Sequence, residues 1–354
     1  MHLFVDISSH GFGHLSITAP VLNVLAKMAP DLQLTVRSKL PLRQLRERID
    51  HPFTLIEAST DFGYIMIDAT QVDLKASAEA YRHAHTAWPT RVIEEARWLA
   101  ALQPDLVLTN VSYLPLAGAT LAGIPALSLC SLNWADLFQH FFGQESWAAP
   151  IHAEMLAAYR SARAFLRITP GMPMPALANA RTIGPIAATG QAHDLGLGTD
   201  KAVLLAMGGI AHGLPVERWP SLPGIRWLVP ANWRCQHPNA VVVESFGLSF
   251  TDLLCSVDAI VTKPGYGTFT EAAANGTPLL YQRRADWPEQ DALIDWLGKH
   301  AVSQEIDACL LDSGQLDEAL RRLWQQRAPP RPALTGARQA AEIIVALGDQ
   351  ATAP

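Results

Sequence analysis

Short runs of apolar residues alternate with longer stretches in which apolar residues recur at helical spacing. In the first half, runs of strand length occupy residues 2–8, 32–38, 53–59, 104–110 and 125–131. The spacing of apolar residues from Leu15 to Leu25 predicts a helix, and residues 74–102 predict two helices divided at Pro89. Nearly continuous apolar strands separated by helices are typical of a parallel sheet covered on both faces.

The alternation fails once and then resumes. Residues 169–188 hold four prolines without a clean period and predict an interdomain linker. Further strand-length runs occupy residues 201–209, 225–230, 240–246, 257–263 and 278–283, and residues 333–347 predict a final helix. We therefore expect an α/β protein with two doubly wound, Rossmann-like domains, residues 1–168 and 189–330, followed by a C-terminal helix within residues 331–354.

The composition is consistent with two domains and argues against nucleic acid as a partner. The chain has 354 residues, of which 49% are hydrophobic and 17% charged, so it has enough apolar surface for two cores. A net charge of −6, without runs of arginine, argues against a nucleic-acid-binding protein. The four cysteines are widely spaced and form no CxxC pair, so we expect reduced thiols and neither disulfides nor a zinc site.

No segment has the pattern of a secretion signal or of a transmembrane helix. The N-terminus lacks a basic region followed by a long apolar stretch. The most apolar region, residues 106–132, is interrupted by Asn110, Pro115 and Pro125, which favours a strand, a helix and a strand over a membrane span. We therefore expect a cytoplasmic protein with no transmembrane segment.

The first predicted strand is followed by a loop rich in histidine and glycine, SSHGFGH, residues 8–14. In doubly wound sheets, ligands bind at the carboxyl ends of the strands, where this loop lies. Gly11 and Gly13 permit conformations and close approaches that a Cβ would prevent. A third glycine at dinucleotide spacing is missing, so the loop does not predict a dinucleotide site.

His14 is the candidate catalytic residue of this loop. Because Pro20 would disrupt a helix interior, we expect the helix to begin near Thr18, with that hydroxyl as the N-cap. His14 would then precede a helix N-terminus, whose dipole lowers the pKa of an imidazole and keeps it neutral. A neutral histidine can accept a proton from a hydroxyl or a water. The alternative is that His10 and His14 only cap turns and hydrogen bond with the backbone.

A second glycine-rich loop begins the stretch KPGYGTFTEAAANGTPLL, residues 263–280. Gly265 and Gly267 let backbone amides approach a ligand, and the helix after them offers its positive N-terminus to a phosphate. Thr268 is placed to cap that helix or to contact a phosphate oxygen. Glu271 fits either a capping box with Thr268 or a carboxylate that accepts hydrogen bonds from ribose hydroxyls.

Two further stretches are candidates for donor contacts in the second half. The loop MGGIAHG, residues 207–213, places the amides of Gly208 and Gly209 after a predicted strand. The stretch RRADWPEQ, residues 283–290, combines Arg283 and Arg284, which can neutralise a diphosphate, with carboxylate and amide groups that suit sugar hydroxyls. The alternative for the second stretch is a solvated loop.

The motifs HGFGH and KPGYGTFTEAAANGTPLL together resemble glycosyltransferases of the GT-B fold. Within that fold they resemble the group that contains the UDP-N-acetylglucosamine transferase of peptidoglycan lipid II synthesis, glycosyltransferase family 28, and they are also similar to the N-terminal region of plant L-arabinokinases. The resemblance extends from residue 2 to about residue 300. It implies two domains that face a cleft, a nucleotide-sugar donor held mainly by the second domain, and an acceptor that faces the first. In this family a final helix often crosses back to the first domain, which suits residues 333–347.

The resemblance also implies roles for individual residues. It makes His14 the base and Glu271 the ligand of the donor ribose, and it lets Gln290 contact donor hydroxyls, with Glu289 in place of an aspartate. The acceptor-side loop comprises His10, Gly11 and Gly13, and the candidate phosphate and donor contacts are Gly208, Gly209, Gly265, Gly267, Thr268 and Arg283. The GGIAHG loop lacks the serine that is usual in the lipid-linked enzymes. No DxD motif is present, and the fold generally works without a metal, so we expect neither a metal nor another cofactor.

The sequence thus predicts a metal-independent transferase of the hexosyl or N-acetylhexosaminyl class. It would move a sugar from a nucleotide diphosphate sugar, with a UDP-sugar the first candidate, to an unknown hydroxyl acceptor, and the resemblance implies inversion at the anomeric carbon. The first alternative is a nucleotide-sugar hydrolase, because the same GH loop occurs in a hydrolase of pseudaminic acid synthesis. The second is a non-catalytic protein that binds a nucleotide sugar.

The acceptor itself is not predicted. The aromatic residues of SLNWADLFQHFF, residues 131–142, fit either a platform for the acceptor or the core, and we favour the core. A lipid-linked acceptor would require peripheral contact with a membrane surface, without a spanning helix.

Overall fold

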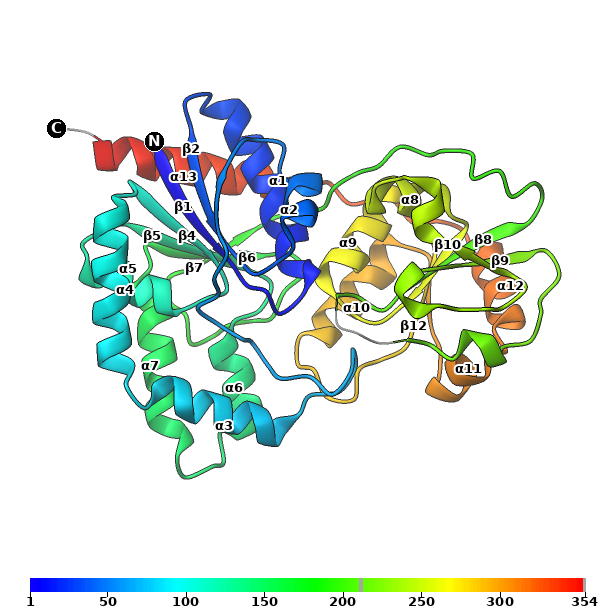
Figure 1. Ribbon diagram of the computed structural model, residues 1–354, viewed down its shortest axis with the longest axis horizontal. Coiled ribbons are helices and arrows are strands. Elements are labelled where there is room, and N and C mark those ends of the chain that lie inside the picture. Colours follow the sequence, from blue (N-terminus) through cyan, green and yellow to red (C-terminus); the bar gives the residue numbers. More distant parts are fainter. Residues whose placement is uncertain (210–212, 353–354) are drawn as a thin grey trace.

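The computed structural model describes residues 1–209 and 213–352, which form two α/β halves lying side by side (Figure 1). The first half contains a sheet of seven parallel strands in the order β3-β2-β1-β4-β5-β6-β7. Its strands are β1 (His2–Ile7), β2 (Gln33–Arg37), β3 (Thr54–Ile56), β4 (Leu106–Asn110), β5 (Ala126–Cys130), β6 (Ala164–Ile168) and β7 (Ala180–Ile183). The reversal of strand order between β1 and β4 is the topological switch point of a Rossmann-type sheet.

The second half repeats this topology with six parallel strands in the order β10-β9-β8-β11-β12-β13. Its strands are β8 (Lys201–Ala206), β9 (Ile225–Val229), β10 (Ala240–Val242), β11 (Ala259–Thr262), β12 (Leu279–Tyr281) and β13 (Ser303–Glu305). The switch point here lies between β8 and β11. The expected fold class, two doubly wound parallel-sheet domains, is confirmed.

Helices cover both sheets. In the first half they are α1 (Phe12–Met28), α2 (Leu42–Arg48), α3 (Leu74–His85), α4 (Trp88–Leu102), α5 (Leu114–Leu121), α6 (Trp134–Phe142) and α7 (Ala148–Ser161). The second half contributes α8 (Phe250–Ser256), α9 (Tyr266–Asn275), α10 (Gln290–His300), α11 (Ala308–Ser313), α12 (Asp317–Gln325) and α13 (Gly336–Thr352). Short 3-10 helices occupy Val216–Arg218, Ala231–Trp233 and Val243–Phe246. None of the helices within the described ranges is long and apolar enough to cross a membrane.

Three strands were not expected from the sequence. The strand β6 directly follows α7, so its apolar residues could not be distinguished in the sequence from those of the helix. The strands β7 and β13 are short edge strands in which most side chains are at least partly exposed, and they therefore lack an apolar run. The strand β7 lies inside residues 169–188, the stretch expected as a linker, and hydrogen bonds with β6 as part of the first sheet. The chain that connects the two sheets therefore runs from residue 184 to residue 200.

The helix α13 lies on the first half, although it follows the second half in the sequence. It packs along α1 and also contacts β4 and β7 (Figure 1). Its buried residues Ala340, Ala341 and Ile344 belong to the same apolar cluster as β1 and α1. The chain therefore crosses between the two halves twice.

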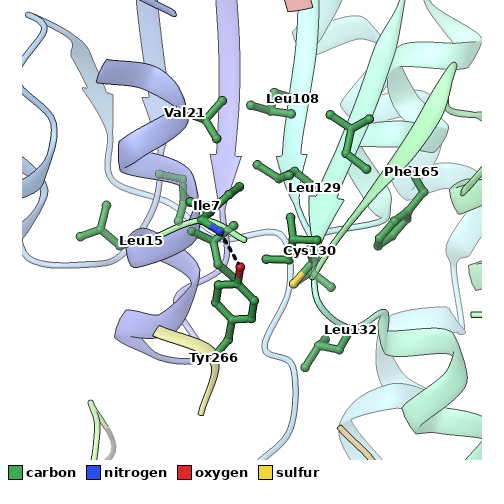
Figure 2. Close-up of a cluster of buried hydrophobic side chains, with 14 of the residues drawn as sticks. Ile7, Leu15, Val21, Leu108, Leu129, Cys130, Leu132, Phe165 and Tyr266 are labelled. Carbon is green, nitrogen blue, oxygen red and sulfur yellow. Dashed lines mark hydrogen bonds between the residues drawn. The ribbon is translucent and has the colours of Figure 1, made fainter. Parts of the chain in front are cut away.

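Tyr266, the first residue of α9, joins the apolar cores of the two halves. Its side chain lies near Ile7 and Cys130 of the first half (Figure 2). Its hydroxyl accepts a hydrogen bond from the backbone amide of Ile186 at 2.9 Å and donates one to the carbonyl of Thr169 at 3.1 Å. The N-terminus of α9 is thereby fixed against the first domain.

A buried ion cluster holds the carboxyl ends of β1 and β2 together. Arg37 binds Asp6 with its Nε and Glu95 with both terminal nitrogens, and all three side chains are buried. The guanidinium also lies 4.9 Å from the ring centroid of Phe4 and 4.7 Å from that of Trp98. Because Asp6 precedes the loop at residues 8–14, this cluster supports the strand end from which the loop departs.

Removal of the cation from this cluster is expected to be costly. Arg37→Leu leaves two buried carboxylates unpaired and should lower the free energy of unfolding by about 3–5 kcal/mol. Urea unfolding measures the loss, with Arg338→Leu as a control because Arg338 forms an exposed pair with Glu342 one helical turn away. Equal unfolding midpoints for the two variants would contradict a stabilising role for the cluster.

Candidate functional site

The loops expected to bind ligands meet at the junction of the two halves. The N-terminal end of α1 lies beside the N-terminal end of α9 (Figure 1). A Cβ on Gly267 would clash with Ser16 and would lie 3.6 Å from the Cα of Gly13. A Cβ on Gly209 would lie 2.7 Å from the ring of Phe12. These two glycines therefore permit the domains to approach each other, and their contact with a phosphate stays a prediction.

The helix α1 begins earlier than expected. Its first residue is Phe12, with Gly11 as the N-cap, so the prediction of a start near Thr18 was wrong. Pro20 lies inside the helix and deprives the carbonyl of Ser16 of its usual partner, but the helix continues because its apolar face is buried against the sheet and α13. His14 consequently lies in the first turn of α1 and not before it.

His14 is buried and hydrogen bonds with the end of a neighbouring strand. Its Nδ1 lies 2.7 Å from Oδ1 of Asn110, the last residue of β4. The Nδ2 of Asn110 donates to the hydroxyl of Thr18, which in turn donates to the carbonyl of His14, both at 2.8 Å. Burial lowers the pKa of His14 to about 4, although the hydrogen bond with Asn110 acts in the opposite direction. Burial therefore favours the neutral imidazole at physiological pH, whereas the sequence argument had attributed neutrality to the dipole of a helix beginning after His14.

His10 lies in the same cluster, between aromatic rings from both halves. Its ring is parallel to that of Trp287, with centroids 6.0 Å apart, and perpendicular to that of Trp134, with centroids 5.3 Å apart. The pKa of His10 lies well below its usual value because the ring is buried and because His14, Arg284 and Lys263 are close. Its Nε2 is buried and has no hydrogen-bond partner among residues 1–209 and 213–352.

Two cations from the second half face this cluster. The Nζ of Lys263 lies beside Gly208 and Gly265, 3.5 and 3.8 Å from the positions a Cβ would take on those residues. The guanidinium of Arg284 lies 3.6 Å from the ring centroid of Trp287. Gly208 has a φ of +90°, a backbone conformation that favours glycine. In this conformation its backbone lies close to Lys263. The residues that follow it, 210–212, lie outside the described part of the chain.

Neither cation has an ion-pair partner within the described ranges. No carboxylate lies within 4.0 Å of Lys263 or Arg284, and Nε and Nη2 of Arg284 form no hydrogen bond there. Burial and the repulsion of Arg284 lower the pKa of Lys263 to about 7, and burial lowers the pKa of Arg284 to about 10, although the negative charge of Glu289 acts in the opposite direction on both and that of Asp68 does so on Arg284. Buried charges are normally paired or bound to a ligand. The sequence missed Lys263, although the residue directly precedes the PGYG motif.

Arg283 and Arg284 have different environments. Arg283 is exposed and forms ion pairs with Asp291 and Glu305. Its neighbour Arg284 is buried at the domain junction. The structure thus does not bring Arg283, the arginine selected from the sequence, into the cluster, but it does bring in the adjacent one.

The carboxylates expected to bind the donor already have partners. Glu271 is buried and forms a two-point ion pair with Arg48 at the end of α2 in the other half. Glu289 is buried and accepts hydrogen bonds from the hydroxyl of Ser131 and from Nε1 of Trp287. Burial raises the pKa of Glu271 and of Glu289. Both carboxylates therefore hold the two domains together in this state.

The remaining candidates lie near the junction in structural roles. The helix α9 begins after Gly265, so the capping box between Thr268 and Glu271 was wrong: Thr268 is the third residue of the helix. The amide side chain of Gln290 accepts from the backbone N–H of Arg284 and donates to its carbonyl, which fixes the conformation of that arginine's backbone. Thr268 is only partly buried and remains accessible.

The stretch 131–142 belongs mainly to the core. Trp134, Phe138 and Phe142 are buried among other apolar residues of the first half. Nε1 of Trp134 donates at 2.7 Å to Asp61, and burial raises the pKa of this carboxyl group to about 7. Sequence patterns could not have identified Asp61 as a member of this cluster, because it lies in a loop after β3 that contains no recognisable motif. No group of three or more side chains in the described ranges is arranged to hold a metal ion.

Comparison with known proteins confirms the fold. A L-arabinokinase of Arabidopsis thaliana is 23% identical over 368 residues, which cover 96% of this chain and 33% of that protein, so the chain spans about a third of that relative. No family model matches the chain. The likeness to plant L-arabinokinases is confirmed, while membership of the lipid II transferase group stays a prediction.

Solved structures share the two-domain architecture. The glycosyltransferase of kitacinnamycin has a TM-score of 0.62 at 15% identity and covers 99% of this chain and 94% of that one. The glycosyltransferase VinC, solved with dTDP, has a TM-score of 0.57 at 16% identity and covers 99% and 95%. A Listeria monocytogenes protein assigned as a UDP-N-acetylglucosamine 2-epimerase has a TM-score of 0.59 at 13% identity and covers 100% and 98%. The fold is GT-B, and it carries more than one kind of chemistry.

Proposed function

We propose that this chain transfers a sugar from a nucleotide diphosphate sugar to a hydroxyl acceptor. The observation that carries the proposal is the pair of cations, Lys263 and Arg284, which lie at the junction of the two sheets with no carboxylate within 4.0 Å in the described ranges and with Glu289 as the one carboxylate that acts on both from further away. A diphosphate would neutralise both charges and satisfy the free N–H groups of Arg284. Gly208 and Gly265 lie next to the same ammonium group, because a Cβ on either residue would lie within 3.8 Å of it.

The proposed reaction requires a base on the opposite side of the junction. His14 comes from the first domain and presents a neutral imidazole. Its Nε2 would take the proton of the acceptor hydroxyl as the acceptor oxygen bonds to the anomeric carbon. The bond from that carbon to the diphosphate breaks, and Lys263, Arg284 and the N-terminus of α9 stabilise the negative charge of the leaving group. A single displacement of this kind inverts the anomeric carbon.

Fixed positive charge at the leaving group supports transfer without a metal. A divalent cation in such a reaction neutralises developing charge on the diphosphate. Lys263 and Arg284 supply that charge from side chains of the second domain. By resemblance we propose UDP as the nucleotide and a hexosyl or N-acetylhexosaminyl group as the transferred sugar. VinC binds dTDP in the same fold, so a thymidine donor belongs in the same test.

Donor binding requires movement at the domain junction. For Glu271 to bind a ribose, Arg48 must release it, and for Glu289 and Gln290 to contact sugar hydroxyls, the contact of Glu289 with Ser131 must open. We propose that the two domains separate along this edge to admit the donor and close again around it. Arg48 is 21% exposed and Glu271 only 2%, so release of Arg48 leaves a buried carboxylate that the ribose hydroxyls must satisfy in its place.

The function is tested by measuring release of the nucleoside diphosphate. Mass spectrometry follows UDP and dTDP released from UDP- and dTDP-sugars, with and without a panel of hydroxyl acceptors. We expect release that depends on an acceptor, and a decrease of about 10²–10⁴-fold in His14→Ala, because a positioned general base contributes that much. Nucleotide affinity should be unchanged in this variant.

Other outcomes of this assay contradict the proposal in distinct ways. Full turnover of the donor alone would indicate a hydrolase. Tight nucleotide binding without turnover would indicate a binding protein. Unchanged turnover in His14→Ala would remove the proposed base.

The pH dependence of nucleotide affinity follows from Lys263. Its pKa of about 7 means that the free side chain is charged below pH 7 and loses its charge above it, while a bound diphosphate favours the charged form. The affinity for UDP or dTDP should therefore decrease from pH 6.5 to pH 8.5, by up to about tenfold per pH unit. Lys263→Met should bind more weakly and show a flat profile over this range. A rise in affinity with pH, or the same slope in the variant, would contradict this role.

A further inference from the structure

Asn110 and Thr18 form a closed hydrogen-bond circuit with His14. The backbone carbonyl of His14 accepts from Thr18 Oγ1, Thr18 Oγ1 accepts from Asn110 Nδ2, and Asn110 Oδ1 contacts His14 Nδ1 at 2.7 Å. Asn110 and Thr18 are fully buried, and His14 is 7% exposed. The circuit links the first turns of α1 to the carboxyl end of β4, at the switch point of the first sheet.

We propose that Asn110 is a positioning residue that fixes His14 in the tautomer with its proton on Nδ1, and that Thr18 fixes the orientation of Asn110. This inference rests on the proposed function for its consequence in catalysis, but the tautomer itself is a property of the folded chain. It determines which ring nitrogen is available as the base, namely Nε2.

The tautomer follows from the direction of each hydrogen bond. The hydroxyl proton of Thr18 is donated to the carbonyl of His14, so the hydroxyl oxygen can only accept from Asn110. The amide NH2 group of Asn110 must then face Thr18, and its carbonyl oxygen must face the imidazole. A carbonyl oxygen cannot donate, so Nδ1 of His14 carries the proton.

The neutral character of the partner distinguishes this arrangement from a histidine–carboxylate pair. A carboxylate would stabilise the imidazolium form, whereas an amide orients the ring without supplying negative charge. The groups that surround His14 do not place a negative charge beside its ring either. His10 and the ring of Trp134 contact His14, Lys263 and Arg284 act on neighbouring His10, and Asp61 binds the indole of Trp134. His14 therefore remains an unprotonated base in moderately acidic solution.

Nitrogen-15 NMR of histidine-labelled protein tests the tautomer directly, with His14→Gln used to assign the signal. At pH 7 we expect Nδ1 protonated and Nε2 unprotonated, and titration should show that His14 stays neutral to about pH 4. Asn110→Asp should raise the pKa of His14 by about 1–3 pH units, because it places a negative charge on the ring nitrogen. The acidic limb of kcat/KM should move to higher pH by the same amount, a change that a purely structural role of Asn110 would not produce.

A matched pair of variants tests Thr18. Thr18→Val removes the group that accepts from Asn110 and should release the amide, so that signal from the Nε2-protonated tautomer of His14 appears. Thr18→Ser keeps the hydroxyl and should retain the wild-type tautomer and pH profile. Circular dichroism and the unfolding midpoint establish that each variant is folded.

The inference and the proposed function fail in different measurements. A proton on Nε2 in the wild type, or an unchanged pKa of His14 in Asn110→Asp, would overturn the positioning role whatever the enzyme does. The expected NMR result in a protein that turns over no nucleotide sugar would support the positioning role and contradict the proposed transferase activity.

Discussion

The placement of two like charges at the domain junction, with no carboxylate within 4.0 Å of either in the described ranges, is the constraint on which the candidate site depends; Arg284 is buried and Lys263 is partly buried. Lys263 and Arg284 lie where the carboxyl ends of both sheets meet, and the cost of their burial is visible in the lowered pKa values of both side chains and of His10. The packing of the two apolar cores offsets the free-energy cost of this arrangement. The same two cations on a solvated surface would carry no such cost. An anionic ligand that enters between the domains recovers this cost as binding energy. Burial also lowers the pKa of His14, so the same physical condition would prepare both the proposed anion site and the proposed base.

The domain junction is closed by groups that we propose to bind the donor. Glu271 binds Arg48, Glu289 binds Ser131, and the ring of Trp287 lies parallel to that of His10. These contacts satisfy carboxylates and aromatic surfaces that would otherwise be exposed in an open cleft. Because each contact joins one domain to the other, exchange of these partners for a ligand is coupled to domain movement.

Much of the fold could be predicted because the signal is local. Most strands buried on both faces are continuous apolar runs, and the loops after β8 and β11 are marked by glycine, at Gly208 and Gly265. Strands with partly exposed side chains, β7 and β13, gave no such signal. The start of α1 was also predicted wrongly. The prediction relied on the proline in the helix interior, whereas tertiary contacts, which the sequence does not show, maintain the helix.

The site was predicted in outline but not in its partners. His14 and the glycine loops could be selected from the sequence, whereas Asn110 became relevant only when the fold placed the end of β4 beside α1. The pairing of Arg48 with Glu271 joins residues 223 positions apart, which no spacing rule predicts. Arg283 and Arg284 are adjacent in the sequence, and only the direction of each side chain shows that the second faces the junction.

Titration calorimetry of UDP and dTDP with Arg284→Met and Arg283→Met tests the central claim most directly. The two variants remove the same charge from neighbouring positions, one buried at the junction and one paired at the surface. We predict that Arg283→Met binds the nucleotide as the wild type does. Arg284→Met should bind at least about tenfold more weakly, since a charge-assisted hydrogen bond contributes about 1.5–3 kcal/mol. Equal affinities for the two variants, or no binding of either nucleotide by the wild type, would contradict a diphosphate site between the domains.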